Sequence, residues 1–319
     1  MSLNVRALRP SDRDDLQRFV SEREYPTPVF ASPELARKLA LEDFDQAFLS
    51  ATTQENIFCL VAILQERIVG FVLGQLNETE SITGDPQTEI VDYCASAQPV
   101  FHMLLAETAR RAREAGDHYL VCHTNETQEK EKRWAEAFGM TTELYRTYMT
   151  VRGDEEFPVH PEYRVRRAKE HEMLFIMSVV ADHSPAYIPA FRPVDEKAVQ
   201  ASFVDSYSSL SARDKKKVPL VLWHKPTDDL VGYMILMPQK LFRGRGPLAM
   251  YMYDIAVGER GQGKGLSKWL ALGSKALMAK MGGGFLFGDV SPENKLALSA
   301  TLALGSRIDS RRWGLRLIQ

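Results

Sequence analysis

The chain repeats itself, and this repeat limits what it can fold into. Val69-Gly70-Phe71-Val72-Leu73 in the first half is matched by Val231-Gly232-Tyr233-Met234-Ile235 in the second. Each stretch is the second arm of an expected hairpin, since two apolar runs flank a short polar turn in both halves. The surrounding segments follow the same order, β-α-α-β-β-β-α-β-α-β. The sequence therefore predicts a duplicated domain, with halves at 1–152 and 160–319.

The length and charge of the chain fit two ordinary globular domains. The 319 residues can form two cores, and a hydrophobic content of 45% with 26% charged residues is typical of soluble proteins. A formal net charge of −2 provides no overall basic field for nucleic acid or for a membrane surface. No signal peptide and no membrane-spanning run are recognised. We expect a cytoplasmic protein without nucleic-acid or membrane partners.

The three cysteines give no sign of a metal site. Cys59, Cys94 and Cys122 are scattered along apolar runs, and no CxxC or cysteine/histidine spacing typical of zinc occurs. We expect buried free thiols and no metal.

A glycine-rich turn is the main candidate for a binding site. Leu248–Val257 reads as a strand, and an amphipathic helix that includes Leu266 is expected to continue to Met281. Between them lie Gly261, Gly263 and Gly265. A strand, a glycine turn and a helix N-terminus together present backbone N–H groups that suit a pyrophosphate. The alternative is a helix entry whose glycines serve only packing.

Two nucleotide-binding motifs fit this turn poorly. A dinucleotide fingerprint requires an acidic residue some twenty positions downstream, where this chain has Gly282-Gly283-Gly284. A phosphate-binding loop for ATP requires G-x-x-x-x-G-K-[ST], which does not occur in this sequence.

The second half resembles the GNAT family of N-acetyltransferases, in which this turn joins the fourth strand to the third helix. The family signature is Q/R-x-x-G-x-G/A. Arg260–Gly265 fits its letters, whereas Gln262–Ser267 fits its usual distance from the strand end at Val257. We prefer the register that begins at Gln262.

A second motif of the family, N-x-x-A-x-x-L-Y-x-x-L-G-F, is also present in part. Asn294, Ala297, Leu304 and Gly305 match it, but its tyrosine is replaced by Thr301. In the first half, Cys94–Val100 stands where the glycine turn should be. A tandem pair with a degenerate first half has a layout similar to that of mycothiol synthases.

The resemblance implies an α+β fold made of two tandem GNAT-like domains. Each would have a mostly antiparallel sheet of roughly six or seven strands, with helices on both faces. The first half would be a degenerate domain without a pyrophosphate loop, and the second would hold acetyl-CoA. The implied cofactor-binding residues are Ile255, Ala256, Val257, Gln262, Gly263, Lys264, Gly265, Leu266, Ser267 and Asn294. For Asn294, capping of the last helix is an equal alternative.

The catalytic groups are open, because the family's usual acid is absent at Thr301. Tyr251, Tyr253 and Asp254 on the preceding strand are the candidates. Packed aromatic rings and a structural salt bridge are the alternatives for these side chains. Strict alternation along the strand predicts Tyr251, Tyr253, Ile255 and Val257 on one face, with Met250, Met252 and Asp254 on the other.

The resemblance implies acetyl transfer from acetyl-CoA to a primary amine of a small acceptor, by direct attack in the C-terminal domain. The alternative is a catalytically silent protein that binds CoA or acyl-CoA, or an interaction module. The expected partner is a small-molecule amine, and the chain could be a monomer or a homodimer.

Overall fold

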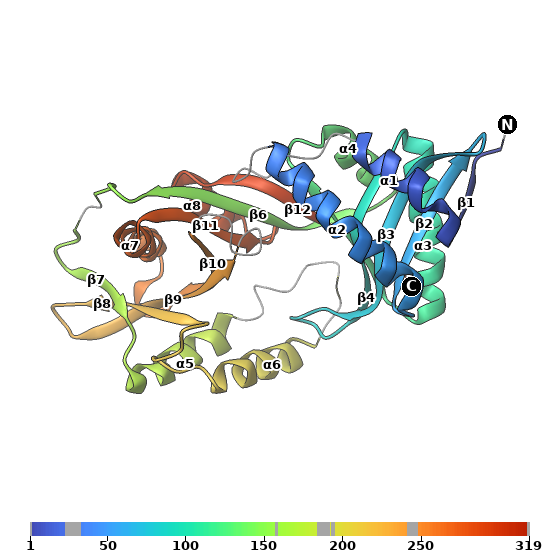
Figure 1. Cartoon of the computed structure of the whole chain (residues 1–319). Coiled ribbons are helices and arrows are strands. Elements are labelled where there is room, and N and C mark those ends of the chain that lie inside the picture. Colours follow the sequence, from blue (N-terminus) through green and yellow to red (C-terminus); the bar gives the residue numbers. More distant parts are fainter. Residues whose placement is uncertain are drawn as a thin grey trace. The chain divides into compact units, whose positions relative to one another are not determined.

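A computed structural model describes residues 2–22, 33–156, 159–183, 192, 195–240 and 248–317 (Figure 1). The chain forms two compact units. Unit 1 comprises Met1–Glu143 and Asp309–Gln319, and unit 2 comprises Leu144–Ile308. Within the described residues, no helix is both long and apolar enough to cross a membrane.

Unit 1 is a six-stranded sheet with strand order β1-β2-β3-β4-β5-β12. All neighbouring strands are antiparallel except β4 and β5, which are parallel. Its strands are β1 (Asn4–Ala7), β2 (Ile57–Leu64), β3 (Arg67–Thr79), β4 (Pro86–Ala95), β5 (Tyr119–Asn125) and β12 (Arg307–Arg316). Its helices are α1 (Arg13–Glu22), α2 (Pro33–Thr53), α3 (Gln98–Ala115) and α4 (Glu129–Ala137).

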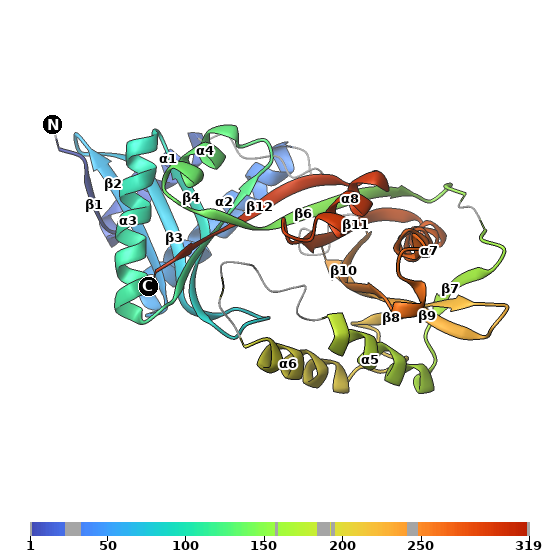
Figure 2. The ribbon, with the colours of Figure 1, turned by 180° about the vertical axis from the view of Figure 1, so that it is seen from behind.

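Helices cover both faces of the unit 1 sheet. On one face, Leu104 and Leu105 of α3 pack with Leu60 and Trp313 of the sheet. On the other face, α1 and α2 pack over β2 and β3. Figure 2 views the molecule from behind and brings α3 and α4 in front of this sheet. Burial of apolar side chains on both faces supplies the main driving force for this arrangement.

Unit 2 repeats this pattern with strand order β7-β8-β9-β10-β11-β6. Here β10 and β11 are the parallel pair. Its strands are β6 (Thr141–Arg152), β7 (Tyr163–Arg167), β8 (Val218–His224), β9 (Asp229–Lys240), β10 (Leu248–Val257) and β11 (Gly283–Val290). Its helices are α5 (Met173–His183), α6 (Glu196–Ser208), α7 (Leu266–Lys280) and α8 (Lys295–Ala303).

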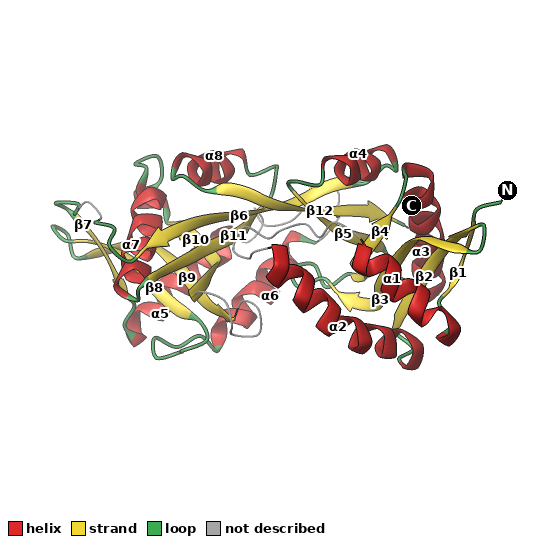
Figure 3. Ribbon diagram, turned by 45° about the horizontal axis from the view of Figure 1, so that its top comes forward, coloured by secondary structure: helices red, strands yellow, loops and turns green. Residues whose placement is uncertain are grey.

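The two faces of the unit 2 sheet have separate cores. Leu270 and Met278 of α7 pack against one face, where Met234 and Met250 point. Ile176 of α5 packs with Tyr233 and other side chains of the opposite face, which α6 also covers. Figure 3 shows α5 and α6 on one side of these strands and α7 on the other.

The last strand of each sequence half completes the sheet that is formed mainly by the other half. β12 pairs antiparallel with β5 of unit 1 from Ser310 to Arg316, and its Trp313 is 1% exposed in that core. Most of β6 pairs with β11 of unit 2, where Met149 and Val151 are buried. The compact units therefore differ in their final strands from the halves 1–152 and 160–319, which follow chain order alone.

The predicted fold class is confirmed. Both units have mostly antiparallel sheets with helices on both faces, and the expected hairpins form around Gln65-Glu66 and around Pro226–Asp229. The sequence also predicts chain breaks at Pro26 and Pro28 and a loop from His183 to Pro193. The two prolines and most of that loop lie outside the described residues.

Candidate functional site

The parallel strands β10 and β11 separate part way along their length. They pair only at Ala249–Phe285, Met250–Leu286 and Tyr251–Phe287. Beyond Tyr251, β10 continues to Val257 paired with β9 alone.

Two amides of β10 face the opening that this separation creates. The Gly258 amide donates to Val231 O of β9 at 3.0 Å. This bond shows which residues of β10 direct their hydrogen-bonding groups towards β9. Because hydrogen-bonding groups of a strand alternate between its two edges, Ile255 and Val257 direct theirs towards the side that β11 has left, and Ala256 directs its own towards β9.

A β-bulge at Tyr253 changes the faces of this strand. Met252 pairs with Leu236 and Asp254 with Ile235, so Tyr253 has no partner on β9. The prediction from strict alternation was therefore wrong. Met250, Met252, Ile255 and Val257 pack on the α7 side, whereas Tyr253, Asp254 and Ala256 lie on the α5/α6 side. The extra residue shifts the alternation after Met252 by one position.

The three glycines of the turn have two different roles. Gly263 and Gly265 have φ angles of 72° and 67°, and a Cβ on either would meet nothing within 4 Å. They permit a left-handed backbone that other residues rarely adopt. Gly261 is buried, and a Cβ there would lie 2.6 Å from Val257 Cγ1. The packing alternative thus holds for Gly261 alone.

The turn leaves backbone donors exposed at the start of α7. A short 3-10 turn (Glu259–Gly261) precedes it, and Gly265 is the N-cap without a side-chain cap. Among the described residues, no backbone carbonyl accepts from the amides of Gly263, Gly265, Leu266 and Ser267. Unbonded N–H groups at a helix N-terminus form a site of positive potential.

The side chains of the turn lie at its surface. Gln262 and Lys264 are exposed, Ser267 is half-buried, and Leu266 is 3% exposed in the core under α7. The buried leucine anchors the turn while its polar residues stay accessible.

Tyr251 belongs to a hydrogen-bonded chain where the strands part. Its hydroxyl donates to Asp289 Oδ2 at 3.1 Å. Arg146 of β6 binds both oxygens of that carboxylate, at 2.9 and 3.0 Å. Burial raises the pKa of the Tyr251 phenol, and the charge of Asp289 raises it further. Tyr251 is therefore a hydrogen-bond donor at neutral pH.

Asp254 is held by two tyrosines. Its Oδ2 accepts from the Tyr207 hydroxyl of α6 at 2.6 Å and from the Tyr233 hydroxyl of β9 at 2.5 Å. Asp254 is 4% exposed. These bonds tie the bulge of β10 to the helix that covers it, so Asp254 fixes the local backbone.

Tyr253 lies beside this network and contacts a cation. The Lys217 ammonium is 4.6 Å from the centroid of the Tyr253 ring and 5.8 Å from that of Tyr207. Burial raises the pKa of the Tyr253 phenol, and the nearby charge of Asp254 contributes.

The two predicted positions near α8 have different environments. Asn294 Oδ1 accepts from the Ala297 amide at 3.1 Å, so Asn294 caps the helix. Thr301 is half-buried near the C-terminal end of α8, and its amide and carbonyl belong to the helix end. The site therefore brings together the turn and the opening of β10. Asn294 caps the helix, and its contact with a cofactor stays a prediction.

Unit 1 has the same strand end without the turn. The Ser96 amide donates to Val69 O at 3.0 Å, as Gly258 does to Val231 in unit 2. The β4 strand has its own bulge at Val91 and pairs with β5 only as far as Glu89. Its helix α3 then begins almost at once, at Gln98, and contains a proline in its first turn.

Aromatic side chains fill the space between α3 and α4 of unit 1. The Phe101 ring lies 5.4 Å from that of Tyr93 and 5.8 Å from that of Trp134, between centroids. His102 Nε2 lies 3.0 Å from Trp134 O. Leu104 packs on Gly70 and Leu270 packs on Gly232, and three positions before them stand Phe101 and Ser267. Gly139 follows α4 and Gly305 follows α8, and five positions before them stand Trp134 and Ala300.

Sequence reasoning missed the partners of the strand residues. Tyr207, Asp289, Arg146 and Lys217 come from four different elements. One signal was present in the repeat, because Tyr233 stands where the first half has Phe71. A hydroxyl gained at a buried position indicates a polar partner.

Comparison with known proteins identifies the fold. The chain is similar to a tandem GNAT protein from the clavulanic acid biosynthesis pathway, with 12% identity, a TM-score of 0.50 and coverage of 100% of this chain and 99% of that one. It is similar to a GCN5-related N-acetyltransferase from Sphaerobacter thermophilus, with 11% identity, a TM-score of 0.57 and coverage of 99% and 96%.

A third similar structure is the GCN5-related glucosamine N-acetyltransferase region of a fungal multi-domain β-N-acetylglucosaminidase. Its identity is 14%, its TM-score is 0.55, and the match covers 98% of this chain and 38% of that one. No protein-family profile and no curated protein matches the sequence. The chain has the fold of the GNAT acetyltransferases. Within that class it has the tandem arrangement.

Proposed function

We propose that the protein is an acetyl-CoA-dependent N-acetyltransferase whose cofactor binds in unit 2. The observation that carries this proposal is the coincidence of two features on one strand. β10 separates from β11 after Tyr251. The same strand leads into a turn where the amides of Gly263, Gly265, Leu266 and Ser267 donate to no backbone carbonyl of the described residues. An opening for a thin chain and a site for a pyrophosphate suit the two parts of CoA.

The proposed roles follow from this placement. The amides of the turn hold the pyrophosphate, and exposed Gln262 and Lys264 lie at its edge. Main-chain groups of Ile255 and Val257 bind the pantetheine arm, with Ala256 between them. The Val257 amide polarises the thioester carbonyl, as a preorganised donor towards the developing oxyanion.

The reaction is direct acyl transfer. The acceptor amine, as its free base, attacks the thioester carbon, a C–N bond forms, the C–S bond breaks and the thiolate takes up a proton. Tyr253 lies on the bulge beside the opening and can donate or relay that proton. Tyr251 is a second donor, engaged with Asp289. Asp254 positions the bulge, since its Oδ2 is occupied by two hydroxyl groups.

A second candidate function is binding of CoA or acyl-CoA without turnover. Thr301 favours it, because a threonine hydroxyl is too weak an acid to replace the tyrosine that the resemblance would place there.

The two functions are separated by binding and turnover measurements on the full chain. CoA binding is measured by calorimetry, and free thiol release is followed with acetyl-CoA and a panel of amines. Thiol release that depends on an amine supports the enzyme. Tight CoA binding with no release supports the silent protein, and absence of both contradicts each of them.

A further inference from the structure

The α5/α6 face of β10 offers a cation to an approaching acceptor. This face carries Tyr253, the bulge residue, two positions after the strands part at Tyr251. Lys217 lies over the Tyr253 ring at 4.6 Å. Its side chain is half-buried at the end of the loop that joins α6 to β8.

Among the described residues, no carboxylate forms an ion pair within 4 Å of the Lys217 ammonium. The nearest acidic residue in its own loop is Asp214, whose Oδ1 accepts from the Lys216 amide at 2.7 Å. Hydrogen bonds from that amide and from the Lys217 amide lower the pKa of Asp214, and the charges of Lys217 and Lys216 lower it further at a longer distance. The ammonium instead lies against two aromatic rings, and such contacts leave its remaining N–H donors available.

Asp254 of β10 and Asp289 of β11 are already engaged. Asp254 is buried and accepts from Tyr207 and Tyr233. Asp289 is bound by Arg146 through both oxygens and by Tyr251. A polycationic acceptor would meet the Lys217 ammonium on this face, and bringing like charges together is unfavourable.

The loop that presents Lys217 is fixed in place. Arg167 Nε donates to Ala212 O at 2.8 Å, and its Nη2 donates to Asp214 O at 2.6 Å. Glu170 Oε2 accepts from the Ala212 amide at 3.2 Å. Anchoring of the loop at Ala212 and Asp214 reduces the entropy that binding through it would cost.

We propose that the acceptor is an anionic amine, a small primary amine whose carboxylate or phosphate is bound by Lys217 while its amino group reaches the opening at Tyr253. This inference rests on the proposed acetyl transfer in unit 2 and adds the charge of its substrate. Polyamines and other polycations are excluded as preferred acceptors.

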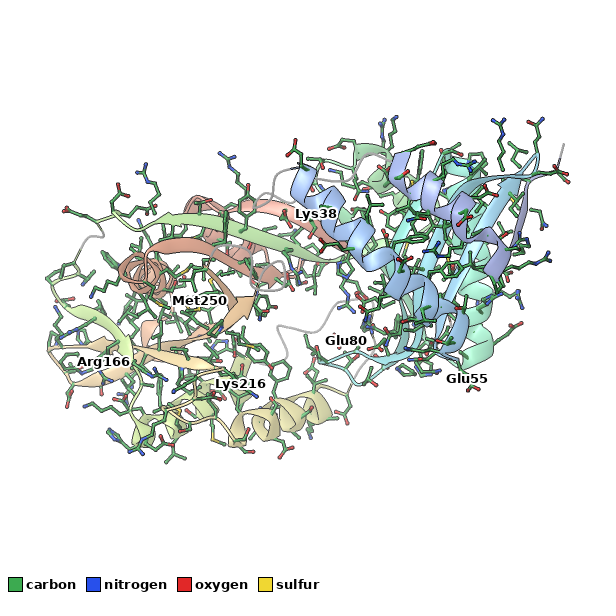
Figure 4. All side chains as sticks on the ribbon, in the orientation of Figure 1. Lys38, Glu55, Glu80, Arg166, Lys216 and Met250 are labelled. Atoms are coloured by element: carbon green, nitrogen blue, oxygen red, sulfur yellow. The ribbon has the colours of Figure 1, made fainter. Side chains whose placement is uncertain are left out.

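The test compares matched acceptors with the full chain and acetyl-CoA. One pair is leucine and isopentylamine, which differ by a carboxylate. The other pair is glucosamine 6-phosphate and glucosamine, which differ by a phosphate. The variant is Lys217→Met, with Lys216→Met as the control, since Lys216 is exposed in the same loop (Figure 4) and both changes remove one charge.

We expect the anionic member of at least one pair to have a kcat/KM roughly tenfold higher or more, as one charge-assisted contact provides. Lys217→Met removes this preference, mainly through KM, and Lys216→Met keeps it. The pair that shows it distinguishes a carboxylate from a phosphate acceptor. Preference for neutral or cationic amines, or a preference unchanged in Lys217→Met, overturns this inference alone. If none of the amines supports thiol release, the proposed function is overturned as well.

Discussion

The equivalent strands β4 of unit 1 and β10 of unit 2 end with the same geometry, but the segments that follow them differ. In both, a bulge precedes the strand end, at Val91 in unit 1 and at Tyr253 in unit 2, and the next amide bonds to the neighbouring strand. Unit 2 then inserts a glycine turn before α7, whereas unit 1 enters α3 directly. Both units share the strand geometry, which is therefore a property of the fold. The glycine turn is what makes the end of this strand a candidate site in unit 2.

The spaces next to these helices differ in the same sense. Unit 1 fills the region between α3 and α4 with Tyr93, Phe101 and Trp134. Unit 2 has Ser267 and Ala300 at the positions of the last two. Small side chains leave room that large aromatic rings would occupy. In unit 1, which lacks the turn, these rings belong to the core on that face of the sheet.

The largest expected effect comes from removing this aromatic filling. Phe101 is 1% exposed, so Phe101→Ala should lower the free energy of unfolding by about 3–5 kcal/mol, because it removes a buried ring and leaves a cavity. Ser267→Ala, at the corresponding position of unit 2, should change it by less than about 0.5 kcal/mol. Urea unfolding measures both. Equal effects of the two substitutions would show that the helices pack alike in both units.

The next effect concerns the turn itself. Gly265→Asp should weaken CoA binding roughly 100-fold, since it strains a left-handed backbone and adds negative charge beside the phosphates. Gly84→Asp is the matched control, because Gly84 in unit 1 has a φ of 73° and equally open surroundings. Calorimetry with CoA measures both variants. Affinity retained in Gly265→Asp would mean that the turn is only structural.

The strand and the turn were predictable from sequence to different depths. The bounds of β10, Leu248–Val257, followed from its apolar run, and a helix after the turn followed from the glycines and the amphipathic pattern. The bulge at Tyr253 was not predictable, because it depends on pairing with β9, and it reversed the faces assigned to Asp254, Ile255 and Val257. Local pattern determines which element forms, whereas register is a tertiary property.

The exchange of final strands was unpredictable for a similar reason. The sequence marks β6 and β12 as strands, but each pairs with a strand far away along the chain. Nothing in the local sequence of either strand specifies its partner. The polar partners of Tyr251 and Asp254 depend on such long-range neighbours, which explains why Asp289, Arg146 and Tyr207 escaped notice.

A smaller effect on stability should follow from replacing one of the two tyrosines that bind Asp254 by its counterpart in unit 1. Tyr233 corresponds to Phe71 of unit 1, so Tyr233→Phe removes one donor from a buried carboxylate that keeps Tyr207. We expect a loss of about 2 kcal/mol in unfolding free energy. Tyr163→Phe is the control, since the Tyr163 hydroxyl has no hydrogen-bond partner within the described part of the chain. Equal stability of both variants in urea would contradict the anchoring role of Asp254.

The smallest expected effect is on the pH dependence of stability, and it comes from Tyr251, whose position in unit 1 is occupied by Glu89. The pKa of Tyr251 lies above its ordinary value of 10.0, because burial and Asp289 disfavour the phenolate. Above pH ~10 the unfolded chain therefore binds fewer protons than the folded chain at this site, and stability falls as the pH rises. At about pH 11 this should amount to roughly 1 kcal/mol relative to pH 9.

Tyr251→Phe removes that part of the decline, although it also removes the hydrogen bond to Asp289 and so lowers stability at both pH values. The informative quantity is the difference in unfolding free energy between pH 9 and pH 11, measured in urea for each protein. This difference should be smaller in Tyr251→Phe than in the unmodified chain. An identical decline in both proteins would show that Tyr251 ionises as freely when folded as when unfolded, and that it is no preorganised donor at the point where β10 and β11 part.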